Sequence, residues 1–163
     1  MNARPSLADQ VIHRIDQAAG LYFRLVLVVG PNDSGKTAAL RDVQRRTGYP
    51  YINVGLELSH RLLDRTIRDR VFEVSQALER LAREHESRVI LIDNNEILFT
   101  PALQQDPLRL LQQAARNRTV VAAWNGKVAG DSLTYAEADH PEHRRYATDG
   151  LLLVGPEVST QMP

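Results

Sequence analysis

The sequence predicts an α/β fold, a three-layer sandwich in which a central parallel sheet of about five strands lies between helices. Short apolar runs, such as residues 25–29 and 88–92, indicate strands that are buried on both faces, as in parallel sheets. They alternate with segments whose apolar residues recur at every third or fourth position, which is the order of βαβ units. The chain has 163 residues, with no internal repeat or linker, so we expect a single domain over residues 1–163.

The expected elements follow the chain in order. An N-terminal helix within residues 1–20 begins near Ser6 and ends at Gly20. Strands are expected over residues 25–29, 51–54, 88–92, 119–123 and 151–154. Helices are expected over residues 37–46, over 59–86 as one helix or two joined near 68–70, briefly after Thr100-Pro101, and over 108–116. Residues 126–150 are polar, with a short hairpin or helix, and residues 155–163 form a tail.

Composition excludes several classes of function. Lys plus Arg and Asp plus Glu both number 20, so no overall positive charge favours nucleic acid or an anionic membrane. The chain has no cysteine, which rules out disulfides, thiolate chemistry and cysteine-ligated zinc. Its longest apolar runs are too short to span a bilayer, and its N-terminus lacks a signal-peptide core, so we expect a cytoplasmic protein without membrane contact.

The segment after the first strand matches the phosphate-binding P-loop. The pattern Gly-x-x-x-x-Gly-Lys-Thr lies between a buried strand and a helix, which is the context that this motif requires. Its glycines let backbone N–H groups turn toward an anion, Lys36 neutralises phosphate charge, and Thr37 offers a hydroxyl to Mg²⁺. We therefore predict ATP and Mg²⁺ as cofactors, bound by Gly30, Pro31, Asn32, Asp33, Ser34, Gly35, Lys36, Thr37 and Ala38.

A second acidic position is expected beside the P-loop. Asp93 ends an apolar strand, as in the Walker B pattern, and parallel strands bring their carboxyl ends to one edge, so Asp93 and Thr37 should share the metal. In many ATPases of the additional-strand class, a glutamate directly follows this aspartate and polarises the attacking water. Here Asn94 follows instead. Glu96 is either the catalytic base or a structural cap of the next segment.

Polar residues near the later strands complete the predicted site. Asn125 follows a strand and corresponds either to sensor 1 of AAA+ ATPases, which contacts the γ-phosphate or the attacking water, or to the start of an Asn-Gly turn. Arg144 and Arg145 precede the final strand, where AAA+ proteins often carry an arginine finger for a neighbouring subunit. The alternative for this pair is a solvated surface. The predicted catalytic residues are Lys36, Asp93, Glu96, Asn125, Arg144 and Arg145.

Several stretches together resemble one family. They run from Leu27 to Thr37, from Tyr51 to Val54, from Leu91 to Phe99, from Gln105 to Leu111 and from Asn117 to Gly126. The chain resembles the BrxF family of small P-loop proteins from type 3 BREX bacteriophage-defence systems, over about residues 25–154. The Asp-Asn-x-Glu and Val-Val-Ala-Ala-Trp-Asn-Gly stretches are more specific than the P-loop itself.

The resemblance implies an antiphage role beside other BREX-type defence proteins. It also implies an AAA+-like sheet, with the P-loop strand central and the strands of Asp93 and Asn125 beside it, and no C-terminal helical lid. Two functions remain open: an ATPase that drives assembly or remodelling of a defence complex on DNA, and a nucleotide-gated adaptor that hydrolyses little. We expect ATP to promote a homo-oligomer or docking onto a partner ATPase. A GTPase would carry an Asn-Lys-x-Asp guanine reader, which Asn125-Gly126-Lys127 does not supply.

Overall fold

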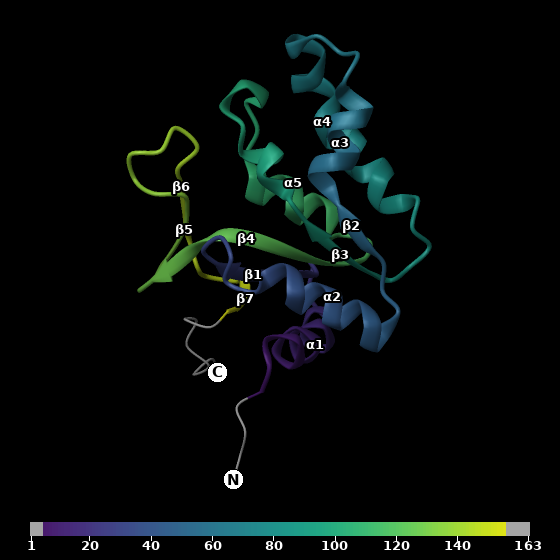
Figure 1. Ribbon diagram of the computed structural model, residues 1–163, viewed down its shortest axis with the longest axis vertical. Coiled ribbons are helices and arrows are strands. Elements are labelled where there is room, and N and C mark those ends of the chain that lie inside the picture. The colour runs from purple at the N-terminus through teal and green to yellow at the C-terminus, as the bar shows by residue number, and fades with distance from the viewer. Residues whose placement is uncertain (1–4, 156–163) are drawn as a thin grey trace.

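The computed structural model describes residues 5–155, and its centre is a parallel β-sheet. The strand order is β2 (Tyr51–Asn53), β3 (Val89–Asp93), β4 (Thr119–Ala129), β1 (Leu25–Gly30) and β7 (Leu152–Val154), and each neighbouring pair is parallel. The predicted α/β class and the five parallel strands are confirmed (Figure 1). One detail is wrong: β3, the strand of Asp93, does not pair with β1, because β4 lies between them.

Helices cover both faces of the sheet. Helices α1 (Leu7–Ala18) and α2 (Lys36–Thr47) lie on one face, and α3 (Val54–Leu62), α4 (Ile67–Arg83) and α5 (Pro107–Ala114) lie on the other (Figure 1). The arrangement gives the three predicted layers. The last predicted segment, residues 155–163, lies outside the described residues except for its first position.

The core is divided by the sheet into two apolar clusters. Alternate residues of β1 point to opposite faces, so Val26 and Val28 pack with α1 and α2, whereas Leu25, Leu27 and Val29 pack with the helices of the other face. All five side chains are buried. This two-sided burial explains why the strand is an uninterrupted apolar run rather than an alternating one.

The long helical segment is two helices, and it starts earlier than predicted. Asn53 accepts a hydrogen bond from Leu56 N through its Oδ1, at 3.0 Å, and so begins α3 at Val54, which the prediction had assigned to the strand. Thr66 begins α4 in the same way, because its Oγ1 accepts from Asp69 N at 3.1 Å. The break therefore lies at residues 63–66 and not at 68–70. The capping side chains set this break, which the apolar periodicity alone could not place.

Strand β4 continues past the parallel sheet into an antiparallel extension. It pairs with β5 (Ser132–Tyr135), which pairs in turn with β6 (Arg144–Ala147). The prediction of a hairpin within residues 126–150 is confirmed, but the Asn-Gly turn is wrong, since β4 runs straight through Asn125 and Gly126. A Cβ at Gly126 would lie 1.8 Å from the Thr134 carbonyl oxygen, so the close approach of β5 requires glycine there.

Aromatic packing fixes this extension to the rest of the domain. Phe99 ends a 3₁₀ helix, η1 (Asn95–Phe99), and its ring stacks on Tyr135 of β5 with a centroid distance of 3.4 Å. Trp124 of β4 meets Phe99 edge-on at 5.1 Å. Because η1 directly follows β3, the extension is packed against the segment that carries Asn94 and Glu96. A second 3₁₀ helix, η2 (Pro101–Leu103), precedes α5 and corresponds to the short helix predicted after Thr100.

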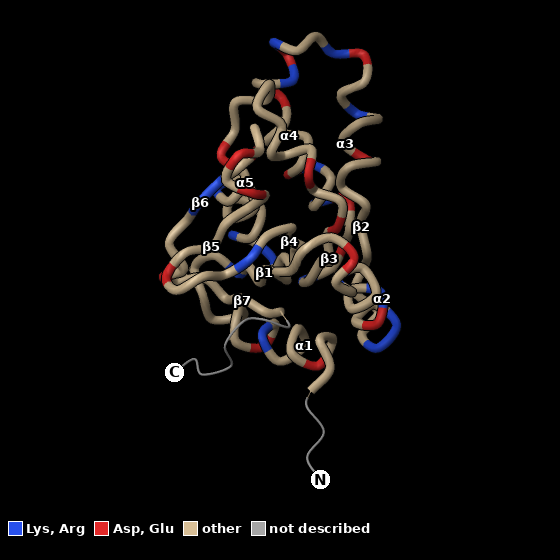
Figure 2. The backbone as a smooth tube through the Cα atoms, turned by 60° about the vertical axis from the view of Figure 1, so that its left-hand side comes forward, with Lys and Arg blue, Asp and Glu red and all other residues tan. Residues whose placement is uncertain are grey.

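Residues of both charges are spread over the described part of the chain. Lys and Arg are interspersed with Asp and Glu along the chain (Figure 2), which agrees with a formal net charge of zero. None of the helices described is both long enough and apolar enough to cross a membrane.

Candidate nucleotide-binding site

The loop between β1 and α2 has the backbone conformation that its glycines predict. Gly35 caps α2 in the left-handed region, with φ of 91°, where a side chain would be strained. A Cβ at Gly30 would lie 2.4 Å from Ser34 Oγ, so the loop folds back tightly over the end of β1. No side chain caps α2, and its first N–H groups are therefore free to bind an anion.

Lys36 lies inside this loop. Its side chain is buried, and Nζ donates to the Gly30 carbonyl at 2.8 Å, to the Pro31 carbonyl and to Ser34 Oγ at 3.3 Å. Burial lowers the pKa of Lys36, while the negative charge of Asp93 is the first of several that oppose the shift. The ammonium group is thus held by loop oxygens at the point where an incoming phosphate would meet it.

Thr37 and Asp93 meet although 56 residues separate them. The Thr37 hydroxyl donates to Asp93 Oδ2 at 2.6 Å, as the parallel-sheet argument predicts. The same oxygen accepts from the Tyr51 hydroxyl at 2.6 Å, and Oδ1 accepts from Asn94 N at 2.9 Å. Asp93 is only 4% exposed. Hydroxyl and carboxylate oxygens are the ligands that Mg²⁺ prefers, and Mg²⁺ takes few of them from the protein because it keeps waters and phosphate oxygens, so this pair fits the ion.

Tyr51 is a contact that the sequence analysis missed. Its ring lies under the Arg41 guanidinium, whose carbon is 3.7 Å from the ring centroid. Burial, followed by the hydrogen bond to Asp93, raises the pKa of Tyr51 to about 12, so its hydroxyl is a donor at neutral pH. The sequence had marked Tyr51 only as the start of a strand, and no local pattern signals that its hydroxyl reaches the end of the neighbouring strand.

Glu96 lines the same cleft, and an unusual backbone turn at Asn94 places it there. Asn94 adopts the left-handed conformation, with φ of 53°, and η1 then begins. Asn95 is buried and donates through Nδ2 to the Ala123 carbonyl at 2.9 Å, which anchors the turn to β4. Glu96 Oε1 accepts from Asn125 Nδ2 at 2.5 Å. The structure therefore brings together Glu96 and Asn125, two of the residues whose roles the sequence left open.

These residues line one cleft of about 590 Å³ at the carboxyl edge of the sheet. Its walls are Asn32, Asp33, Gly35, Lys36, Thr37, Ala38, Asp93, Asn94, Glu96 and Asn125. Gly30, Pro31 and Ser34, also predicted to bind the nucleotide, lie in the loop behind and contact Lys36. The cleft combines helix N–H groups and an ammonium for phosphate, oxygen ligands for a divalent cation, and a carboxylate beside an amide.

A second hollow of about 580 Å³ adjoins this cleft on the side of the antiparallel extension. Both are lined by Asn32, Glu96 and Asn125. The lining of the second hollow also includes Tyr135, which the sequence analysis did not single out, and Glu142 from the polar loop before β6. The cleft therefore continues toward β5 and the loop that follows it.

Arg144 and Arg145 do not reach the cleft of their own chain. Both belong to β6, where Arg145 Nε donates to Ser132 Oγ at 3.0 Å and Arg144 Nη1 donates to the His143 carbonyl at 3.1 Å. Neither lines the two hollows beside the P-loop. The geometry leaves open both predicted roles, a contact with a neighbouring subunit and a solvated pair.

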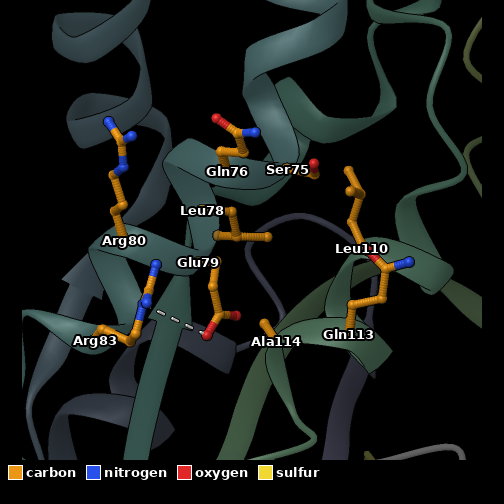
Figure 3. A pocket seen from close by; sticks show the side chains of 9 residues that line it. All are labelled: Ser75, Gln76, Leu78, Glu79, Arg80, Arg83, Leu110, Gln113 and Ala114. Carbon is orange, nitrogen blue, oxygen red and sulfur yellow. Dashed lines mark ion pairs between the residues drawn. The ribbon is translucent and has the colours of Figure 1, made fainter.

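A further depression lies far from these residues, between α4 and α5 (Figure 3). Its lining is largely polar, with Glu79 paired to Arg83 at 3.8 Å and to Arg118 at 3.3 Å. None of the predicted site residues belongs to it. The predicted site residues that line a cleft lie at the carboxyl edge of the sheet.

Comparisons with known proteins give little beyond this geometry. No protein-family model and no curated protein matches the chain. Among solved structures, the chain is similar to PCH-2 of C. elegans, with 19% sequence identity and a TM-score of 0.38, over 73% of this chain and 34% of that one. The chain thus spans about a third of that structure.

Proposed function

We propose that this chain is an ATP-binding P-loop protein that takes Mg²⁺ with its nucleotide. The observation that carries the proposal is the 2.6 Å hydrogen bond between Thr37 and Asp93, across from the buried Lys36. A glycine-rich loop alone is a common turn, but a hydroxyl from the start of α2 and a carboxylate from the end of β3 make an oxygen site beside that loop. Bound Mg²⁺ would neutralise charge on the β- and γ-phosphates.

Calorimetric titration with a slowly hydrolysed ATP analogue tests this proposal. We expect binding that strengthens when Mg²⁺ is present. The same titration with a GTP analogue measures base selectivity. Absence of binding by any nucleoside triphosphate, with or without Mg²⁺, would overturn the nucleotide-site assignment.

We further propose that the site hydrolyses ATP, with Glu96 as the base that polarises water and Asn125 as the residue that orients it. Support comes from their 2.5 Å hydrogen bond at the cleft and from the sheet order. Strand β4 lies between the P-loop strand β1 and the Asp93 strand β3, which is the arrangement that gives the additional-strand class its name. This order supports the AAA+-like reading of the fold.

The alternative is a nucleotide-gated adaptor that binds ATP and hydrolyses little. Asn94 favours it, because an amide cannot accept a proton where many ATPases carry the glutamate. In this reading the Glu96–Asn125 hydrogen bond holds the segment after β3 in one conformation. Steady-state phosphate release, measured with and without duplex DNA, separates the two functions. Turnover that stays at the background rate in both conditions supports the adaptor.

The biological setting follows from the resemblance to BrxF proteins, and we propose a role in a BREX-type bacteriophage-defence complex. ATP-promoted association with a second copy or a partner ATPase would suit a site that continues toward β5 and the loop after it. A cation from the neighbour, Arg144 or Arg145, would then complete it.

Mixing two inactive variants tests this assembly. An arginine finger in trans contributes about 10³- to 10⁵-fold to turnover. If Arg144→Ala or Arg145→Ala removes the finger, adding the Lys36→Ala chain should restore part of the activity. Turnover at the wild-type rate by both arginine variants would identify the pair as a solvated surface.

Phage plating tests the antiphage role, on cells that carry this chain within a BREX-type defence system, with Lys36→Ala as the comparison.

A further inference from the structure

Three hydrogen-bond donors contact the Asp93 carboxylate. The Thr37 hydroxyl and the Asn94 N–H engage one oxygen each. A third donor, the Tyr51 hydroxyl, shares Oδ2 with Thr37 at the same distance of 2.6 Å. In the absence of Tyr51, rotation of the carboxyl group would be limited on the Oδ2 side only by Thr37, the residue that must also serve the metal.

The local strand geometry explains how Tyr51 reaches this position. Tyr51 pairs in register with Leu91, two residues before Asp93, and side chains two residues apart in β3 point to the same face. On that face, which packs against α2, Arg41 lies over the Tyr51 ring at 3.7 Å. The ring is held between the helix and the sheet, and its hydroxyl points along the strand to the carboxylate.

We propose that Tyr51 is a positioning residue for the divalent cation, acting through Asp93. A hydroxyl that donates its proton to Asp93 must present its lone pairs elsewhere, and for Thr37 the open direction is the cleft. By fixing Oδ2, Tyr51 fixes the direction of the Thr37 proton and hence the direction in which the lone pairs of the Thr37 oxygen would meet a bound cation. Arg41 contributes by keeping the Tyr51 ring in place. This inference rests on the proposed nucleotide site.

The test is the Mg²⁺ dependence of nucleotide binding in Tyr51→Phe. The substitution removes only the hydroxyl and retains the ring under Arg41. Calorimetric titration of a slowly hydrolysed ATP analogue is carried out in EDTA and across a series of Mg²⁺ concentrations. Loss of an outer-shell hydrogen bond to a metal ligand typically costs 10- to 100-fold in metal affinity. We expect the Mg²⁺ concentration that gives half of the affinity gain to rise about 10-fold, with affinity in EDTA unchanged.

Two further variants make the result specific. Tyr49→Phe is the matched control, because it removes a hydroxyl two residues away that accepts from Arg88 Nη2 at 3.1 Å on the exposed side. It should leave the Mg²⁺ dependence unchanged. Arg41→Gln keeps the Tyr51 hydroxyl but removes the cation over its ring. It should shift the Mg²⁺ dependence in the same direction by about 2- to 5-fold, the size of an exposed cation–π contact.

The outcomes separate this inference from the proposed function. Wild-type Mg²⁺ dependence in Tyr51→Phe overturns the positioning role while leaving the nucleotide site intact. An equal loss of affinity in EDTA and in Mg²⁺ assigns Tyr51 a structural role only, and also overturns it. If Tyr51→Phe fails to fold, an unchanged Mg²⁺ dependence in Arg41→Gln overturns it instead. Absence of nucleotide binding by the wild-type chain overturns the proposed function itself.

Discussion

The two sides of the cleft are built in different ways. On the side where we propose that Mg²⁺ binds, hereafter the metal side, Asp93 lies at the end of a regular strand, is 4% exposed and accepts three hydrogen bonds. On the opposite side, Glu96 lies in a 3₁₀ helix entered through a left-handed residue, and its carboxylate accepts one side-chain hydrogen bond, from Asn125. The Asp93 carboxylate is thus fixed by several hydrogen bonds at the end of a regular strand. The position of the Glu96 carboxylate depends on one irregular segment.

This contrast separates binding from turnover. A pocket that binds phosphate and metal has higher affinity when its groups are already fixed, because little conformational entropy is then lost on binding. A carboxylate that accepts a proton must keep some freedom to meet the attacking water. We therefore expect damage on the metal side to weaken binding and damage on the Glu96 side to slow turnover.

Apart from loss of the arginine finger proposed above, the largest expected effect is that of Glu96→Gln on turnover. Gln retains the hydrogen-bonding shape beside Asn125 but cannot accept a proton. Removal of a positioned general base typically costs about 10²- to 10⁴-fold in rate. Phosphate release under saturating ATP should fall by that factor, with unchanged affinity for the slowly hydrolysed analogue. Wild-type turnover in Glu96→Gln would assign Glu96 to the structural role. It would also contradict the proposed division of the cleft into a metal side for binding and a Glu96 side for turnover.

The next largest effect is that of Lys36→Ala on affinity. Truncation of one partner of a buried, hydrogen-bonded charge pair costs about 2 to 5 kcal/mol, or about 30- to 5000-fold in the dissociation constant. Calorimetry should show this loss both in EDTA and in Mg²⁺, because Lys36 acts on phosphate and not through the metal. The thermal midpoint of the free protein serves as the folding control. Unchanged affinity would mean that the P-loop does not hold the nucleotide.

The metal side was predictable from the sequence, because each requirement is local or follows from a general rule. Gly35 needs a positive φ and Gly30 tolerates no Cβ, so the glycines of the loop could be interpreted directly. The meeting of Thr37 and Asp93 followed from the alignment of parallel strand ends. Neither argument needs the strand order, and for that reason the wrong expectation that β3 lies beside β1 did not affect it.

The remaining features depend on tertiary detail that no local pattern carries. Tyr51 reaches Asp93 because of the β2–β3 register and because Arg41 closes over its ring. Glu96 reaches Asn125 only because Asn94 adopts a left-handed conformation, which is uncommon outside glycine. From the sequence, Glu96 and Asn125 could be identified as candidate site residues. Neither their contact nor that between Tyr51 and Asp93 could be predicted.

A third prediction concerns the point where β4 leaves the parallel sheet. Gly126→Ala would bring a Cβ to 1.8 Å from the Thr134 carbonyl oxygen, so β5 must move away. Overpacking of this kind typically costs about 1 to 3 kcal/mol of stability. Since Asn125 directly precedes Gly126, we expect turnover to fall further than affinity for the ATP analogue. Gly20→Ala, where no atom lies within 4 Å of the new Cβ, is the control. Equal losses of turnover and affinity would contradict the division of the cleft.

The smallest expected effect is that of Asn53→Ala, which removes the cap of the helix next to the metal side. Asn53 pairs in register with Asp93 but uses its side chain to cap α3, where Oδ1 accepts from Leu56 N. Loss of an N-cap costs about 1 kcal/mol, and a domain of this size should melt about 2 to 4 °C lower for each kcal/mol. Thr66→Ala, which removes the equivalent cap of α4 away from the cleft, is the matched control.

Both cap variants should melt at a similarly lowered temperature and keep the wild-type Mg²⁺ dependence of nucleotide binding within about twofold, since an N-cap effect is confined to its own helix end. The reason is that all three donors to Asp93 come from outside α3: from α2, from the start of β2 and from the backbone that follows β3. If Asn53→Ala instead shifts the Mg²⁺ dependence as far as Tyr51→Phe does, while Thr66→Ala does not, the carboxylate is held by the whole β2–α3 junction. The hydroxyl of Tyr51 would then have no separate part in positioning the metal.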